Sequence, residues 1–159
     1  MPAITAVLHT HNDALRLGRA LETLCPCDEI LIIDRNSDDG TLRVAREYGA
    51  KVMSEYGGSD YAQALHTVKT GWMLCLDPRE ALTEGLSASL FEWKSTAVPD
   101  LSASFAVFRR EETPAGWIQN PIAETRLVPV QWNRWNGYFP VGEPSTVSLD
   151  GELLRFAFP

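Results

Sequence analysis

Short apolar runs alternate with segments of helical periodicity along the first part of the chain. Each run has the length and the aliphatic or β-branched content of a strand that is buried on both faces. The runs predict strands at residues 4–8, 30–33, 51–54 and 72–76. Because strands separated by helices pair in parallel through right-handed crossovers, this pattern predicts an α/β fold. The expected architecture is a mostly parallel sheet flanked by helices.

Helical spacing recurs between and after these strands. One helix is expected to begin at Asp13, and another to run over 41–48 and end at Gly49, a residue type suited to a left-handed C-terminal cap. Further helices are expected over 61–70 and 83–93. The succession of strands and helices therefore accounts for most of the chain as far as Lys94.

After Lys94 the helical spacing is lost, and Pro and Gly become frequent. Short extended segments are expected at 103–109, 124–130 and 147–156. They predict a small β-rich C-terminal extension over residues 95–159 that lengthens the main sheet. The chain has 159 residues, the length of a single domain.

Charge and composition narrow the class of partner. The chain carries 14 Lys and Arg against 21 Asp and Glu, a formal net charge of −7. Nucleic acids and anionic membranes would be repelled by this balance, so neither is expected as a partner. No apolar run approaches the roughly 18 residues of a membrane-spanning helix, and no basic and apolar leader precedes the first strand. We therefore expect a cytoplasmic protein without a transmembrane segment.

Each of two predicted strands ends abruptly in an aspartate, Asp34 after the strand at 30–33 and Asp77 after the strand at 72–76. The carboxyl ends of strands form the ligand crevice of an open α/β sheet, so both acids lie where small molecules bind. The alternative for each acid is a helix N-cap. The repetition of strand and acid favours a site and predicts that Asp34 and Asp77 open into one crevice.

Several motifs around these strands resemble one enzyme family. They are Thr10-His11-Asn12-Asp13, Asp28-Glu29 with Asp34, Ser37-Asp38-Asp39-Gly40-Thr41, and the segment that ends at Asp77. From about residue 4 to about residue 93 they resemble, in order and spacing, the donor-binding half of family-two glycosyltransferases of the GT-A fold. The nearest likeness is the lipopolysaccharide core-type branch. The resemblance implies a Rossmann-type GT-A domain, with a nucleotide-sugar-binding half at 1–94 and an acceptor-side extension at 95–159.

The resemblance implies an inverting transfer of a hexose from a nucleotide diphosphate sugar to a glycan or lipid-linked acceptor. Such a reaction needs a pocket for the nucleoside, positive charge for the departing diphosphate and a base for the acceptor hydroxyl. Asp34 is implied to bind the nucleobase or ribose, and Asn12 to line the same pocket. His11 can reach a phosphate or ribose, or is simply packed. Asp39 is expected to cap a helix and not to touch the ligand.

The segment Asp77-Pro78-Arg79-Glu80 departs from the family pattern. Similar enzymes carry an acid-x-acid element there that binds Mg²⁺ or Mn²⁺, whereas Arg79 occupies the place of the second acid and would repel a divalent cation. Arg79 either neutralises the diphosphate itself, or accompanies a metal site lost with activity, or forms an ion pair with a nearby glutamate. Asp77 with Glu80 would hold a metal only weakly.

The acceptor side also departs from the pattern. The resembled branch has a His-Glu pair in its later β region, and the nearest match here is Gly142-Glu143, which leaves Glu143 as the candidate general base or as an exposed loop residue. Trp117, Trp132 and Trp135 can stack on sugars, or form a core or the interface of a homo-oligomer. Two functions therefore remain open, an active glycosyltransferase and a non-catalytic nucleotide- or nucleotide-sugar-binding module.

Overall fold

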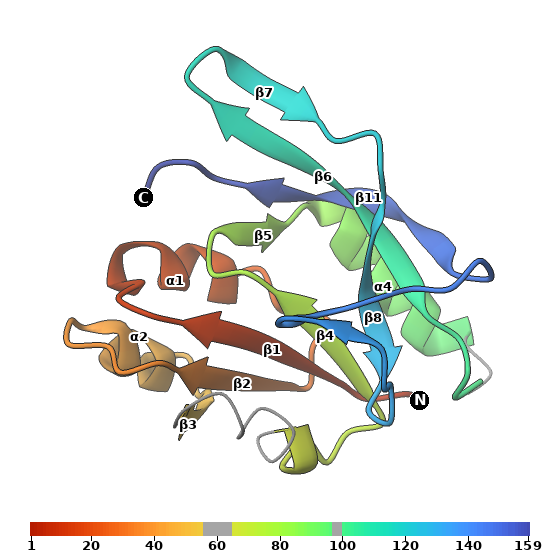
Figure 1. Ribbon diagram of the computed structural model, residues 1–159, viewed down its shortest axis with the longest axis horizontal. Helices are drawn as coiled ribbons and strands as arrows, with labels where there is room; N and C mark the ends of the chain where they lie inside the picture. The colour runs from red at the N-terminus through yellow and green to blue at the C-terminus, as the bar shows by residue number, and fades with distance from the viewer. Residues whose placement is uncertain (56–64, 97–99) are drawn as a thin grey trace.

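The computed structural model describes residues 1–55, 65–96 and 100–159. Its strands and helices alternate at first and then give way to strands alone (Figure 1). The first part contains β1 (Ile4–Thr10), α1 (Ala14–Leu21), β2 (Glu29–Asp34), α2 (Thr41–Glu47), β3 (Lys51–Ser54), β4 (Trp72–Leu76), β5 (Glu80–Leu82) and α4 (Glu84–Thr96). The later part contains β6 (Phe105–Thr113), β7 (Gly116–Gln119), β8 (Glu124–Pro129), β9 (Trp135–Asn136), β10 (Phe139–Pro140) and β11 (Val147–Arg155).

One sheet runs through both parts in the order β3-β2-β1-β4-β8-β6-β11-β5, with β7 paired to β6. The strands β3, β2, β1 and β4 are parallel to one another, as the sequence predicts. β1 separates β2 from β4, so the strands that precede Asp34 and Asp77 are near neighbours. The later strands continue this sheet, beginning with β8, which pairs antiparallel with β4. The expectation of a mostly parallel sheet with a β-rich extension is thus confirmed.

Side chains alternate between two cores on opposite faces of the sheet. On one face, Ile4 and Leu8 of β1 pack in a buried cluster with Leu17 of α1 and Leu86 of α4. On the other face, Val7 packs in a second cluster, against which residues of β9 and β10 also pack. The helices α1, α2 and α4 therefore cover one face, and the short β9-β10 hairpin packs over the other (Figure 1).

The structure differs from the sequence-based expectation in several elements. β5, β7, β9 and β10 were not predicted, because two to four residues carry too little periodicity to be recognised. α4 extends to Thr96, beyond the expected end of that helix at residue 93. Of the helix expected over 61–70, residues 61–64 lie outside the described residues. Residues 65 and 66 are helical, and residues 67–70 are not, so the helix ends earlier than expected. No helix among the described segments has the length and apolar character needed to traverse a bilayer.

The three later tryptophans have different surroundings. Trp132 and Trp135 are partly buried against the second core, and the Trp132 indole N–H donates to the Val141 carbonyl over 3.0 Å. The side chain of Trp117, on β7, is 43% exposed. The packing interpretation therefore applies to Trp132 and Trp135, while Trp117 lies on the surface.

Candidate functional site

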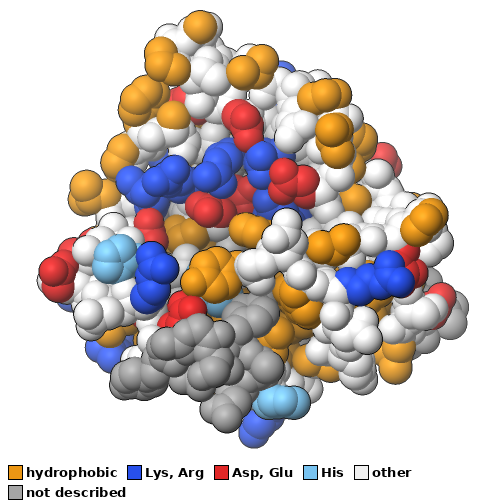
Figure 2. Space-filling model, in the orientation of Figure 1, with side chains coloured by type: hydrophobic (Ala, Val, Ile, Leu, Met, Phe, Trp, Pro, Cys, Tyr) orange, Lys and Arg blue, Asp and Glu red, His pale blue; other side chains and the backbone are white. Residues whose placement is uncertain are grey.

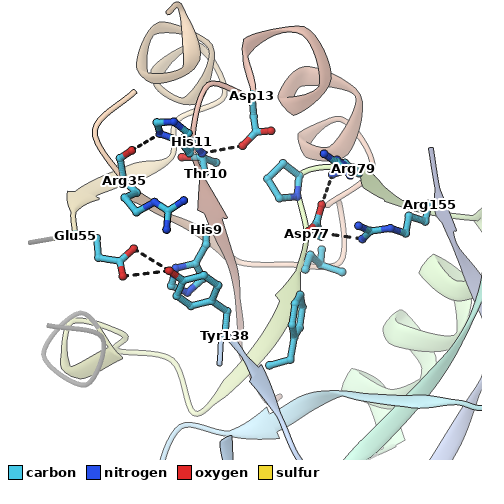
Figure 3. A pocket seen from close by; sticks show the side chains of 13 residues that line it. His9, Thr10, His11, Asp13, Arg35, Glu55, Asp77, Arg79, Tyr138 and Arg155 are labelled. Carbon is cyan, nitrogen blue, oxygen red and sulfur yellow. Dashed lines mark hydrogen bonds and ion pairs between the residues drawn. The ribbon is translucent and has the colours of Figure 1, made fainter. Parts of the chain in front are cut away.

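A cavity of about 400 Å³ opens at the carboxyl edge of the parallel strands. Its walls come from the ends of β1 and β4, from the residues that follow β2 and β3, from the β9-β10 hairpin, and from the end of β11 (Figure 3). The described residues that line it are His9, Thr10, His11, Asp13, Arg35, Glu55, Leu76, Asp77, Pro78, Arg79, Tyr138, Phe139 and Arg155. This is the position expected for a ligand crevice in an α/β sheet.

One wall joins the two parts of the chain through aromatic contact. The rings of His9 and Tyr138 stack with their centroids 3.8 Å apart, and the Tyr138 hydroxyl donates to the Glu55 carboxylate over 3.2 Å. Burial lowers the pKa of His9 to about 4, so its imidazole is neutral at pH 7. His9 and His11 both line the cavity. His9 follows Val7 on the face that the hairpin covers.

Asp13 lies on the cavity although it directly precedes α1. Its carboxylate makes no cap hydrogen bond to that helix and instead accepts the N–H of His11 over 2.8 Å. Asp39 caps the first turns of α1 and α2. Its carboxylate accepts the N–H of Ala14 over 3.2 Å and that of Thr41 over 2.9 Å. Burial raises the pKa of Asp13, and the hydrogen bond from His11 offsets part of this shift. The capping role predicted for Asp39 is therefore confirmed, and Asp13 is released toward the cavity.

Asp34 and Asn12 lie behind the cavity wall. Asp34 is 3% exposed, and its carboxylate accepts hydrogen bonds from the Thr10 hydroxyl over 2.6 Å and from Ser37 over 2.6 and 2.9 Å. Asn12 adopts φ of 53° and links the same loops, donating its N–H to Ser37 and accepting that of Asp38. Neither residue is among those that line the cavity. Both fix the loops that follow β1 and β2.

Asp77 and Arg79 form a tight loop at the end of β4. The Asp77 carboxylate accepts the N–H of Arg79 over 2.9 Å, and the Asp77 carbonyl accepts that of Glu80 over 2.9 Å. Both side chains line the cavity (Figure 3). Asp77 opens into the crevice as expected, but Asp34 does not share it.

Arg155, at the end of β11, supplies a second cation beside this loop. Its guanidinium lies 3.6 Å from the Asp77 carboxylate (Figure 3). In the register of β11 with β5, Arg155 is opposite Glu80, and the N–H of Phe156 donates to the Arg79 carbonyl over 2.9 Å. The last strand therefore holds Arg155 against the same loop that carries Asp77 and Arg79. On the molecular face seen in Figure 2, basic and acidic side chains form a mixed band.

Glu80 points away from the cavity into a buried ion cluster. Its carboxylate accepts two hydrogen bonds from Arg126, over 2.6 and 2.8 Å, and one from the N–H of Asp77 over 2.8 Å. Arg109 lies 3.5 Å from the same carboxylate. Burial alone would raise the pKa of Glu80, but the charge and hydrogen bonds of Arg126 outweigh it and hold that pKa below its ordinary value. Glu80 therefore anchors the loop from beneath.

The geometry can be tested against the divalent cation that the sequence resemblance implies. Mg²⁺ and Mn²⁺ need several oxygen ligands that are free to converge. Asp77 is paired with Arg155, both oxygens of Glu80 are engaged by Arg126, and Arg79 occupies the place of the second acid. Within the described part of the chain, no group of three or more His, Cys, Asp or Glu is arranged to hold a metal. The residues present do not fit such an ion, and this placement argues against Glu80 as a ligand.

The candidate general base lies elsewhere. The Glu143 side chain is 33% exposed and lies 3.6 Å from the guanidinium of Arg134. It is not among the residues that line the cavity. Of the site residues predicted from the sequence, the cavity thus brings together His11, Asp77 and Arg79, and leaves Asn12, Asp34, Glu80 and Glu143 outside its lining.

Several residues that line the cavity were not predicted from the sequence as site residues. Two of them, Arg35 and Asp13, lie next to predicted elements, since Arg35 directly follows Asp34 and Asp13 begins a predicted helix, so their sequence neighbours could have indicated them. Tyr138 and Arg155 had no such local signal, because a two-strand hairpin and the register of β11 bring them to the cavity over long separations in sequence.

Comparison with known proteins supports this architecture. No family model matches the chain. A stretch of 92 residues is 32% identical to an uncharacterized glycosyltransferase of Rickettsia felis and covers 54% of this chain and 32% of that protein. A similar protein of Rickettsia bellii is 32% identical over 89 residues, covering 52% of this chain and 30% of the relative. The chain thus spans about a third of the length of these curated relatives.

Solved structures show the same fold. Glucosyl-3-phosphoglycerate synthase from Mycobacterium tuberculosis, in complex with Mn²⁺, UDP and phosphoglyceric acid, superposes with a TM-score of 0.62 at 13% identity, covering 99% of this chain and 72% of that one. Mannosyl-3-phosphoglycerate synthase from Rubrobacter xylanophilus gives a TM-score of 0.50 at 25% identity, covering 69% of this chain and 39% of that one. The chain therefore has the GT-A fold of glycosyltransferases, and about half of it is similar in sequence to proteins named as glycosyltransferases.

Proposed function

We propose that this chain is the donor-binding part of a glycosyltransferase that takes a hexose from a nucleotide diphosphate sugar, with inversion, for a glycan or lipid-linked acceptor. The observation that carries the proposal is the cavity at the carboxyl edge of β1 and β4, lined by the guanidinium groups of Arg35, Arg79 and Arg155. Guanidinium groups bind phosphate oxygens through paired, charge-assisted hydrogen bonds. Asp13, Glu55 and Asp77 line the same cavity, so the fit to a diphosphate rests on these guanidinium donors and not on an excess of positive charge.

The nucleoside is assigned to the side of the cavity next to the loops after β1 and β2. His11 and Asp13 offer a ring and a carboxylate there. Asp34 and Asn12, predicted from the sequence to contact the ligand, support this side from behind through their hydrogen bonds to Thr10 and Ser37. In this proposal Asp34 acts on nucleotide binding by positioning Thr10, which does line the cavity.

A non-catalytic nucleotide-binding module is the second candidate. It is favoured by the position of Glu143, which pairs with Arg134 outside the lining of the cavity. In the described lining, the carboxylates that can accept a proton from an acceptor hydroxyl are Asp13, Glu55 and Asp77. Each of them has a partner, Arg16 for Asp13, Tyr138 for Glu55 and Arg155 for Asp77, so all three are alternatives to Glu143 in an active transferase.

Calorimetric titration with UDP, GDP, ADP, CDP and dTDP tests the proposal. At least one nucleoside diphosphate is expected to bind, and Arg79→Ala is expected to weaken it by about 1.5–3 kcal/mol, the range for hydrogen bonds to charged groups. Arg110→Ala is the matched control, because Arg110 is an exposed arginine that pairs with Glu152 on the neighbouring strand and does not line the cavity. Absence of binding by the parent protein at millimolar ligand would refute the nucleotide site.

Release of the nucleoside diphosphate from a bound nucleotide sugar separates the two candidate functions. Release that depends on an added glycan or lipid-linked acceptor supports the transferase. Tight binding without release, across a panel of such acceptors, supports the non-catalytic module.

A further inference from the structure

We propose that Arg155 is a diphosphate-binding residue and that, together with Arg79, it takes the place of the divalent cation in this cavity. The inference rests on the proposed nucleotide function and specifies which residues supply the positive charge. The solved neighbour from Mycobacterium tuberculosis was crystallised with Mn²⁺ and UDP, whereas Arg79 and Arg155 line the cavity of this chain.

The first step is that the acids next to the loop are already engaged. Arg155 lies 3.6 Å from Asp77, and Arg126 holds both oxygens of Glu80 in a cluster where Glu80 is 0% and Arg126 2% exposed. Freeing Glu80 for a metal would break two hydrogen bonds of the buried Arg126 and leave Glu124 as its remaining carboxylate partner, which is costly. The chain therefore fills the cation position with its own side chains.

The second step is that the two cavity arginines have donors to spare. The 3.6 Å separation between Arg155 and Asp77 is an ion pair but too long for a hydrogen bond. In the described part of the structure, neither the Arg155 nor the Arg79 guanidinium makes a hydrogen bond to another protein group, and both line the cavity. Arg155 can therefore donate to phosphate oxygens while Asp77 holds it in place.

The third step is that the backbone fixes the two arginines as a pair. The N–H of Phe156 donates to the Arg79 carbonyl over 2.9 Å, and Arg155 is opposite Glu80 in the pairing of β11 with β5. Glu80 in turn is anchored by Arg126 and accepts the N–H of Asp77. The backbone segments that carry the two arginines come from distant parts of the sequence and are thus held together at one end of the cavity by hydrogen bonds that need no ligand.

The charges at this end of the cavity make Arg155 necessary for anion binding. Asp77 and Asp13 both line the cavity, and Asp13 interacts electrostatically with Asp77 and with Arg79. Without Arg155, a diphosphate would face these carboxylates with only Arg79 as compensation, and like charges in a partly buried site repel strongly. With both arginines, two guanidinium groups of the lining balance the two carboxylates, and their donors can bind phosphate oxygens without an added ion.

The test measures the affinity of UDP and GDP, and of uridine and guanosine, in EDTA by calorimetry. The proteins are the parent, Arg155→Ala, Arg155→Lys and the control Arg110→Ala. Arg155→Ala is expected to lower the affinity for the diphosphate about 10- to 100-fold, the fold-change that corresponds to hydrogen bonds with a charged group. The affinity for the nucleoside should change by less than about twofold, because the nucleoside lacks the phosphates that Arg155 would contact. Arg155→Lys keeps the charge but loses the paired donors, so its loss of diphosphate affinity should be smaller than that of Arg155→Ala.

The outcomes separate the inference from the function on which it rests. A parent that binds a diphosphate only when Mn²⁺ is added, or an Arg155→Ala protein that binds it as tightly as the parent, overturns the inference and leaves the nucleotide site standing. A parent that binds no diphosphate with or without Mn²⁺ refutes both. If Arg155→Ala does not fold, Arg155→Lys is compared with the parent. If the two proteins bind the diphosphate with equal affinity and respond equally to EDTA, the paired-donor role of Arg155 is contradicted.

Discussion

The two parts of the sheet contribute different things to the cavity. The parallel strands β1, β2 and β4 are buried on both faces and provide its floor and its acids, Asp13 and Asp77. The later strands reach the cavity only at Tyr138, Phe139 and Arg155, and they bring the balancing charge and the aromatic wall. The comparison teaches that local sequence pattern places Asp77 and Arg79, whereas long-range strand register places Arg155 beside them.

The largest effect is expected from the buried ion cluster that joins the parts. Glu80→Ala removes one of the two carboxylates that pair with Arg126, whose side chain is 2% exposed, and leaves it with Glu124, so the free energy of unfolding should fall by about 3–5 kcal/mol. The exposed pair of Lys51 with Glu29 in the parallel part is the control, and Glu29→Ala should cost less than about 1 kcal/mol. Urea unfolding of both variants measures the difference, and equal losses would contradict the anchoring role of Glu80.

A second contrast concerns the cores. Leu74 on β4 is 0% exposed, and Leu74→Ala should lower the free energy of unfolding by about 2–5 kcal/mol through lost burial and a residual cavity. Ile118 on β7 is 58% exposed, and Ile118→Ala should change the free energy of unfolding by at most about 0.5 kcal/mol. Chemical denaturation of the two variants checks this. A large loss at Ile118 would show that β7 is covered in solution.

The stacked pair of His9 and Tyr138 predicts a smaller, pH-dependent effect. Burial lowers the pKa of folded His9 to about 4, below its ordinary value of about 6.5, so between these values the unfolded chain binds a proton that the folded chain does not. The free energy of unfolding should therefore fall as the pH is lowered from 6.5 to 4, by about 1–3 kcal/mol from this residue. His9→Phe keeps an aromatic ring and should remove that part of the slope. Unfolding curves at pH 7 and pH 4.5 for both proteins test it, and identical slopes would contradict the burial of His9.

The sequence predicted the parallel strands, the helices α1, α2 and α4, and three cavity residues, because each depends on short-range periodicity or on a motif. It did not predict β5 or β7, which are too short to show a period, nor the hairpin that carries Tyr138. Asp34 and Asp77 look equivalent as acids after strands, but hydrogen bonds from Thr10 and Ser37 hold Asp34 behind the wall. Arg155 depends on the register of β11 with β5, which no local pattern encodes.

The central claim is that side chains have replaced the ion. The effect of Mn²⁺ on the affinity for a diphosphate tests this claim most directly. The measurement compares UDP and GDP binding in EDTA and in Mn²⁺ for the parent and for Arg79→Asp, which restores the acid-x-acid spacing at Asp77. The parent should bind equally well in both conditions, since Arg79 and Arg155 supply the charge, and Arg79→Asp should bind weakly in EDTA and regain affinity in Mn²⁺. A parent that requires Mn²⁺ would contradict the account.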